Sequence, residues 1–163
     1  MALRTPVYLD HNATTPLDHR VLAVLHRTQR DHFGNPSSGS HALGWAAAKL
    51  VDDARTQVSG LIGADPAEII FTSGATEANN LALKGVIQSA GRANPRLITS
   101  SIEHKAVLDS CAWLEQQGVS VTYLRPGRHG LIQPDQVADA IDEQTVLVSV
   151  MHVNNELGTC NDI

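Results

Sequence analysis

The sequence predicts an α/β protein with a three-layer α-β-α arrangement and a mostly parallel sheet. From residue 68 onward, short apolar runs alternate with longer segments in which apolar residues recur at helical spacing. Strands that read as apolar runs indicate a parallel sheet covered on both faces by helices. In such sheets ligands bind beyond the carboxyl ends of the strands, so the loops that follow the strands are where a site is expected.

The first part of the chain is predicted to be mainly helical. Two long segments have apolar residues at three- and four-residue steps. Pro16 suits the turn before the first, and Gly60 and Gly63 offer C-terminal stops for the second. The expected elements are an extended piece at 7–9, a polar turn at 10–16, a helix at 17–32, a loop at 33–40 and a helix at 41–61.

The rest of the chain is predicted to alternate between strands and helices. We expect strands at 68–72, 96–100, 119–124 and 145–153, and helices at 76–90, 104–117 and 134–141. A βα pattern calls for a further crossover helix after the last strand, and a sheet that stopped there would keep an unpaired apolar edge. We therefore expect the chain to be a truncated, N-terminal part of a longer domain.

Composition and charge narrow the classes of partner. The chain is 42% hydrophobic and 18% charged, and its formal net charge of -5 is spread without long runs. This gives no electrostatic footprint for nucleic acid or for an anionic membrane. No run approaches transmembrane length and no apolar leader opens the sequence, so we expect a cytoplasmic protein.

The sequence gives little support for a metal or disulfide site. Cys111 and Cys160 stand far apart and outside any C-x-x-C spacing, so both are predicted to be reduced thiols. His152 and Glu156 could suggest metal ligands, but strand and turn geometry would not hold them on one face. We expect no metal.

The first informative loop is Ser73–Asn80, whose small residues lead directly into a helix. Backbone N–H groups at such a helix start can approach a phosphate, and the hydroxyls of Ser73 and Thr76 could add hydrogen bonds. The same residues would also suit a tight βα turn with hydroxyl caps.

Two further loops carry candidate polar groups. His104 follows the strand at 96–100, where its ring could stack on an aromatic cofactor and move protons, or could be an ordinary helix-start histidine. Asn154 and Asn155 follow the strand at 145–153, where they could bind an oxygen of a ligand or could be turn residues.

Taken together and in order, the motifs are far more specific than any one of them. They comprise Tyr8-Leu9-Asp10 with Ala13-Thr14-Thr15-Pro16, Phe33-Gly34-Asn35-Pro36-Ser37-Ser38 with His41, Phe71-Thr72-Ser73-Gly74-Ala75-Thr76-Glu77, Glu103-His104-Lys105-Ala106-Val107, and Met151-His152-Val153-Asn154-Asn155-Glu156-Leu157-Gly158. From about Val7 onward the chain closely resembles the NifS/IscS-type cysteine desulfurases of the class V aminotransferase family.

The resemblance implies an incomplete large domain of a pyridoxal 5'-phosphate (PLP)-dependent transferase of fold type I. Residues 1–15 would belong to the small domain and residues 16–163 to the N-terminal part of the PLP-binding large domain. Members form homodimers and convert L-cysteine to L-alanine and an enzyme-bound persulfide, which supplies sulfur-acceptor proteins for iron–sulfur cluster assembly and tRNA thiolation. By similarity, Ala75 and Thr76 would contact the cofactor phosphate, His104 would stack on its ring, and Asn155 would approach the ring oxygen and the substrate carboxylate.

The resemblance also implies that decisive groups are absent. The family's Schiff-base lysine and persulfide cysteine match no residue of this sequence, because Lys49, Lys84 and Lys105 lie outside the lysine motif and neither cysteine corresponds. We therefore expect the chain alone to be inactive. Two alternatives stay open: a non-catalytic module that binds PLP or dimerises, and another fold-type I enzyme such as a selenocysteine lyase or an aminotransferase.

Overall fold

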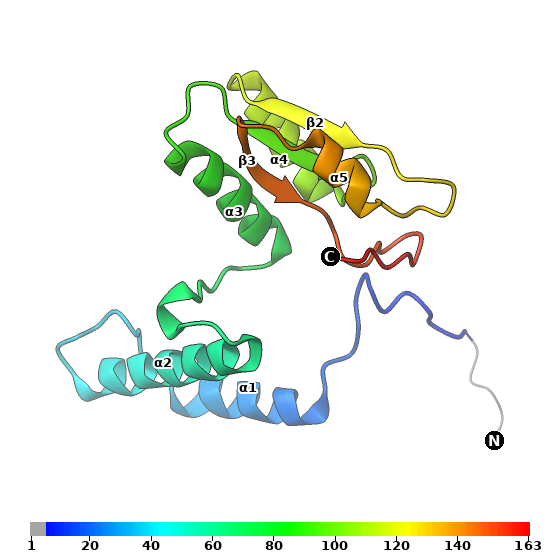
Figure 1. Cartoon of the computed structure of the whole chain (residues 1–163). Coiled ribbons are helices and arrows are strands. Elements are labelled where there is room, and N and C mark those ends of the chain that lie inside the picture. Colours follow the sequence, from blue (N-terminus) through cyan, green and yellow to red (C-terminus); the bar gives the residue numbers. More distant parts are fainter. Residues whose placement is uncertain (1–5) are drawn as a thin grey trace. The chain divides into compact units, whose positions relative to one another are not determined.

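The computed structural model describes residues 6–163, and the chain forms two compact units divided between Phe71 and Thr72 (Figure 1). We call them the N-terminal unit and the C-terminal unit. The predicted domains, residues 1–15 and 16–163, have a different boundary from these two units, and that division stays a prediction. No helix in residues 6–163 combines the length and the apolar character that a membrane span requires.

The N-terminal unit consists of helix α1 (His19–Asp31), helix α2 (Ala42–Ile62) and a 3-10 turn, η1 (Pro66–Glu68). The predicted helices are confirmed with small shifts at their ends. Helix α1 begins at His19 because the Asp18 carboxylate accepts a hydrogen bond of 2.8 Å from the backbone N–H of Arg20 and caps the helix. Helix α2 continues through Gly60 and ends at Gly63, the second of the two expected stops, whose φ is 70°.

The loop between α1 and α2 depends on two glycines because the backbone folds closely onto itself. A Cβ atom on Gly44 would collide with the carbonyl of Ser38, and one on Gly34 would collide with the carbonyl of Leu43. His41 caps α2, since its Nδ1 accepts a hydrogen bond of 3.2 Å from the Gly44 N–H. The turn formers of this segment therefore build a defined loop.

The strand predicted at 68–72 is wrong. Asp65 and Glu68 form a reciprocal capping box around η1, which takes Glu68 into the 3-10 turn. Ile69 keeps an extended backbone, but residues 69–72 pair with no strand of the sheet. A strand requires a hydrogen-bonded neighbour, and β-propensity alone does not supply one.

The C-terminal unit contains a sheet of three strands, and their parallel pairing confirms the predicted parallel arrangement. Its strands are β1 (Arg96–Ser100), β2 (Ser120–Leu124) and β3 (Thr145–Ser149), in the order β2-β1-β3. Strand β1 pairs in parallel with both neighbours, with Leu97 opposite Val121 on one side and Leu147 on the other. The strand expected at 145–153 ends at Ser149, because the chain then turns into an irregular hairpin.

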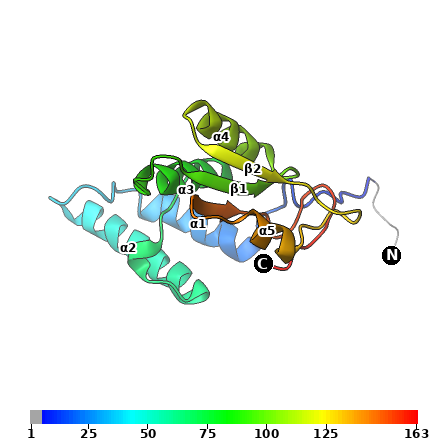
Figure 2. The same ribbon diagram turned by 45° about the horizontal axis from the view of Figure 1, so that its top comes forward.

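Helices cover both faces of this sheet, which confirms the three-layer arrangement (Figures 1 and 2). They are α3 (Ala75–Ser89), α4 (Lys105–Gln116) and α5 (Pro134–Ala140). On one face, Leu97 packs against residues of α3 and α4 that include Leu83, Ile87, Val107, Cys111 and Leu114. On the other face, its neighbour Ile98 packs with Leu124, Ile132 and residues of α5, namely Val137 and Ala140. Successive β1 side chains thus enter opposite cores.

Truncation of the central strand should test this arrangement. Leu97 is 0% exposed, so Leu97→Ala should lower the free energy of unfolding by about 2–5 kcal/mol through lost burial and a cavity. Leu81→Ala on α3 is the matched control, because Leu81 is 48% exposed and should cost less than about 1 kcal/mol. Urea denaturation followed by circular dichroism measures both. Equal losses would contradict the assignment of Leu97 to the core.

The stability of the chain should fall at alkaline pH. Burial raises the pKa of the Cys111 thiol from 9.0 to about 11, and the nearby Glu115 and Glu103 carboxylates add to this. Between these values the unfolded thiol loses its proton first, so stability present below pH 9 declines as pH rises, by on the order of 2 kcal/mol. Cys111→Ala should flatten this decline in urea denaturation measured from pH 8 to pH 11. Tyr123, whose pKa is raised to about 12 by burial, by Glu115 and by Cys111, is present in both proteins. The difference between the two curves therefore reports Cys111 together with its effect on Tyr123, and parallel curves would contradict the prediction.

Candidate active site at the carboxyl edge of the sheet

Two loops at the carboxyl edge of the sheet enclose a cavity of about 400 Å³. One loop follows β1 and contributes residues 101–105, and the other follows β3 and contributes residues 154–157. Because β1 and β3 are adjacent and parallel, their carboxyl ends bring these segments together although about fifty residues of chain separate them. The cavity is therefore a product of the sheet topology.

His104 stands at the mouth of this cavity as the N-cap of α4. Its Nδ1 accepts a hydrogen bond of 3.1 Å from the backbone N–H of Ala106. Because Nδ1 is the acceptor, the neutral ring carries its proton on Nε2, so Nε2–H is the free donor. The capping bond fixes the ring, and the side chain is otherwise exposed. His104 can therefore present a flat ring and one N–H group to a ligand.

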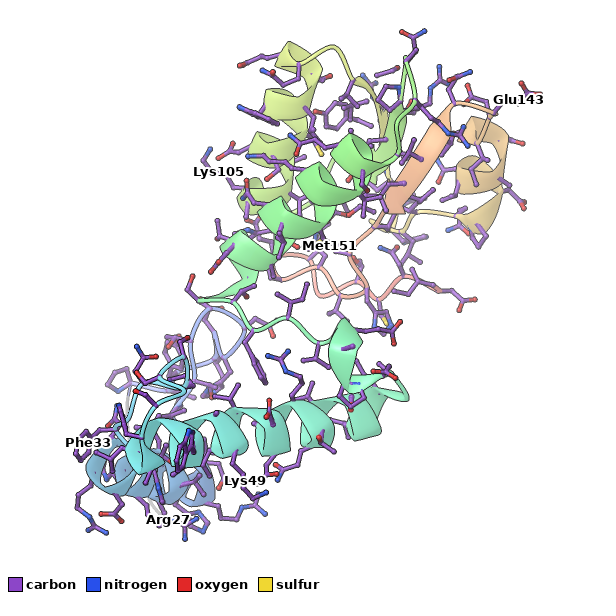
Figure 3. All side chains as sticks on the ribbon, turned by 90° about the vertical axis from the view of Figure 1, so that its left-hand side faces the viewer. Arg27, Phe33, Lys49, Lys105, Glu143 and Met151 are labelled. Carbon is purple, nitrogen blue, oxygen red and sulfur yellow. The ribbon has the colours of Figure 1, made fainter. Side chains whose placement is uncertain are left out.

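Glu103 was not predicted as a site residue, yet it joins the two loops. Its side chain is buried, and one carboxylate oxygen accepts hydrogen bonds from the Ser100 hydroxyl at 2.7 Å and from the Met151 backbone N–H at 2.8 Å. Met151 lies just past β3 and is labelled in Figure 3. The carboxylate thus ties the end of β1 to the start of the β3 loop. An acidic residue in the loop that follows a buried strand was the only signal in the sequence.

The two adjacent asparagines have different environments. Asn154 is buried, and its Nδ2 donates to the Ile102 carbonyl at 2.8 Å while its Oδ1 accepts from the backbone N–H groups of Glu156 and Leu157 at 2.9 and 2.8 Å. Asn155 is exposed and lines the cavity with His104. The amide of Asn154 is therefore used to hold the loops, whereas Asn155 is exposed at the cavity.

The start of α3 is an open helix N-terminus outside the lining of this cavity. Ala75 and Thr76 form its first turn, and the N-cap, Gly74, offers no side chain to satisfy the free backbone N–H groups. Figure 1 shows α3 running opposite to the strands, so that it begins toward the edge where they end. Backbone N–H groups and the helix dipole at such an end favour an anion.

The Ser73 hydroxyl, which was expected to donate to a phosphate, already donates to another group in the structure. The Glu77 carboxylate accepts from both the Ser73 hydroxyl, at 2.6 Å, and the Ser73 backbone N–H, at 2.7 Å. These bonds lower the pKa of Glu77 from its ordinary value. The hydroxyl of Thr76, by contrast, remains exposed at the helix start.

The three lysines of the sequence are all held at the surface. Lys49 pairs with Asp53 at 3.0 Å and Lys105 with Asp109 at 2.7 Å, and their side chains are 74% and 81% exposed. Figure 3 labels both lysines. Lys84 lies over the Trp113 ring, with Nζ 4.4 Å from the centroid. A lysine that attacks a carbonyl needs a desolvated setting, and none of the three has one.

The two cysteines also differ. Cys111 is buried in the core, whereas Cys160 is exposed and its Sγ lies 3.2 Å from Nε2 of His152. Across residues 6–163, no three or more His, Cys, Asp or Glu side chains gather as a metal ion would require.

Comparison with known proteins places this geometry in a family. The chain matches the family model described as Aminotransferase class-V over residues 7–163. Among curated relatives it is 55% identical to "Cysteine desulfurase IscS" of Azotobacter vinelandii and 53% identical to the protein of the same name from Pseudomonas aeruginosa. Each alignment covers 99% of this chain and 40% of the relative, so the chain spans about two fifths of their length.

Solved structures agree with the sequence match. A "NIFS-LIKE PROTEIN" superposes with a TM-score of 0.89 at 40% identity, over 95% of this chain and 42% of that one. "SspA in complex with cysteine" gives a TM-score of 0.88 at 45% identity, over 94% and 44% of the two chains. DndA from Streptomyces lividans gives 0.82 at 42% identity, over 96% and 44%. By its sequence and its fold, the chain belongs to the class-V aminotransferase family.

Proposed function

We propose that this chain is the N-terminal part of the cofactor-binding domain of a PLP-dependent cysteine desulfurase. The observation that carries the proposal is the cavity at the carboxyl edge, which His104 and Asn155 line together. The relatives named cysteine desulfurase, at 55% and 53% identity, support the same activity. The complete protein would release sulfur from L-cysteine and form L-alanine and an enzyme-bound persulfide.

The residues around the cavity fit a flat, anionic cofactor. The His104 ring is held by its capping bond and could lie against an aromatic ring, and the Asn155 amide could donate to a ring oxygen or to the substrate carboxylate. When bound, PLP supplies the electron sink for cleavage of the carbon–sulfur bond. The work left to the chain is to orient the ring and the substrate and to move protons, a role that an imidazole such as that of His104 can serve.

The phosphate would bind at the start of α3. Ala75 and Thr76 belong to the first turn of that helix, whose backbone N–H groups receive no cap from Gly74. A phosphate there would gain hydrogen bonds from backbone N–H groups and from the Thr76 hydroxyl, and would be favoured by the helix dipole. The negative charge of the nearby Glu77 carboxylate disfavours a bound anion. Its hydrogen bonds from the hydroxyl and the N–H of Ser73 offset part of this effect.

Further properties of the whole protein are proposed with this activity. They are a homodimeric assembly, transfer of sulfur to acceptor proteins that serve iron–sulfur cluster assembly and tRNA thiolation, and a cytoplasmic location. The division into a small-domain segment at 1–15 and a large-domain part at 16–163 belongs to the same proposal. They rest on likeness to the desulfurases. The alternative is the non-catalytic module, which is favoured by the exposed setting of Lys49 and Lys105 and by the packing of the half-buried Lys84 against Trp113.

Cofactor binding can be measured on the 163-residue chain. In equilibrium dialysis, Thr76→Val should lower the affinity for PLP about tenfold, because the hydrogen bond from the hydroxyl to the charged phosphate is lost. Binding of pyridoxal, which has no phosphate, should be unchanged in Thr76→Val. His104→Ala should weaken both ligands, since ring contact does not depend on the phosphate.

Two residues outside the proposed site provide controls, the half-buried Thr28 and the exposed His129. Thr28→Val on α1 and His129→Ala in the turn before α5 should leave both titrations unchanged. If Thr76→Val weakened pyridoxal as much as PLP, the phosphate would not lie at the start of α3. If His104→Ala weakened neither ligand, the ring contact would be wrong.

Activity can be measured in a chimera in which this chain replaces the matching part of the Azotobacter vinelandii protein. The chimera should release sulfide from L-cysteine under a thiol reductant, and His104→Ala should lower kcat by at least about a hundredfold through loss of proton transfer. The chain alone should release no more sulfide than free PLP does. A chimera that folds and binds PLP but releases no sulfide would exclude the desulfurase and favour the non-catalytic module.

A further inference from the structure

The hairpin after β3 brings a thiol and an imidazole together outside the cavity. Val153 and Cys160 form an antiparallel bridge, the Asn161 N–H donates to the His152 carbonyl at 2.7 Å, and the Asn154 N–H donates to the Thr159 carbonyl at 2.9 Å. As a result Cys160 Sγ lies 3.2 Å from His152 Nε2, although eight residues separate them in sequence. Neither residue lines the cavity formed by 101–105 and 154–157.

Buried polar bonds hold this hairpin in place. The Asn161 side chain is 3% exposed, and it accepts from the Ile132 N–H at 2.9 Å and donates to the Met151 carbonyl at 2.8 Å. The Thr159 hydroxyl donates to the Gly130 carbonyl at 3.2 Å. Both ends of the segment that carries Cys160 are therefore anchored, so the pair does not depend on two free surface side chains meeting by chance.

The pair has the composition of an activated nucleophile. A thiolate, not a thiol, attacks soft electrophiles, and a neighbouring imidazole that takes the thiol proton raises the thiolate fraction. Both side chains are exposed, so an electrophile in solution can reach the sulfur. Cys111 provides the opposite case within the same chain, because it is 0% exposed and has no such base beside it.

We propose that Cys160, with His152 as its base, is a site of thiol–disulfide exchange with small disulfides such as oxidised glutathione. His152 Nε2 takes the Cys160 proton, and the thiolate attacks one sulfur of the disulfide. A new bond forms between Cys160 Sγ and that sulfur while the original disulfide bond breaks. The second glutathione leaves as a thiolate and receives the proton from the imidazolium. No other oxidant is consumed, and the site does not depend on the proposed desulfurase function.

The test is incubation of the 163-residue chain with oxidised glutathione at pH 7, followed over time by intact mass and peptide mapping. We expect a single glutathione adduct, on Cys160, and none on Cys111. Cys160→Ser should abolish the adduct. His152→Asn should slow its formation about five- to tenfold, because the thiolate fraction falls while part of that loss is offset by greater intrinsic nucleophilicity. His129→Ala, an exposed histidine elsewhere in the C-terminal unit, should leave the rate unchanged.

Each alternative result overturns the proposal. Adducts that form on Cys111 at the same rate would show that exposure and the imidazole do not select the site. If His152→Asn formed the adduct at the same rate as the unaltered chain, His152 would not be the base. Circular dichroism must show that this variant is folded. If it is not, His152→Gln serves as the second variant. In urea both cysteines should react at similar rates, and a persistent difference there would place the selectivity in local sequence instead of the fold.

Discussion

The cavity depends on one buried carboxylate that links two loops distant in sequence. Glu103 accepts from Ser100 at the end of β1 and from Met151 in the other loop, so the end of β1 and the exit of β3 share an acceptor. Without it, the Met151 N–H and the Ser100 hydroxyl would lose their partner in a partly buried setting, at a cost of about 1–3 kcal/mol for each group left unsatisfied. The bond from Asn154 to Ile102 adds a second link between the same loops. His104 and Asn155 face one space because their neighbours are tied together.

In each of the two loops, one residue holds the loop in place and the next residue is exposed at the cavity. Glu103 and Asn154 are buried and form hydrogen bonds that hold the loops, whereas His104 and Asn155 are exposed at the cavity. A ligand bound at this cavity would therefore meet loops that are already held in place, which would lower the ordering cost of binding. Loops that are tied to the strands in this way can position functional side chains more precisely than free loops can.

Periodicity predicted most of the architecture, and it failed where pairing decides the outcome. The strand at 96–100 and the helix at 41–61 were found because their apolar patterns reflect burial that the fold provides. Residues 68–72 have the composition of a strand, yet a capping box takes Glu68 and no neighbour pairs with the rest. The position of His104 and Asn155 beyond parallel strands followed from topology. The roles of Glu103 and Asn154 could not be predicted, because their partners lie 48 and 52 residues away.

The same buried hydrogen bonds hold both sides of the hairpin after β3, the side at the cavity and the side that carries Cys160. Asn154 holds its first turn beside the cavity, and Asn161 holds its return beside Ile132 and Met151. Cys160 lies between these anchors on the return side, while Asn155 lies on the cavity side. Since the anchoring bonds use neither the thiol nor the imidazole, the fold places no structural demand on the Cys160–His152 contact. A group added to Cys160 would replace that contact and leave the amide anchors, and with them the cavity, in place.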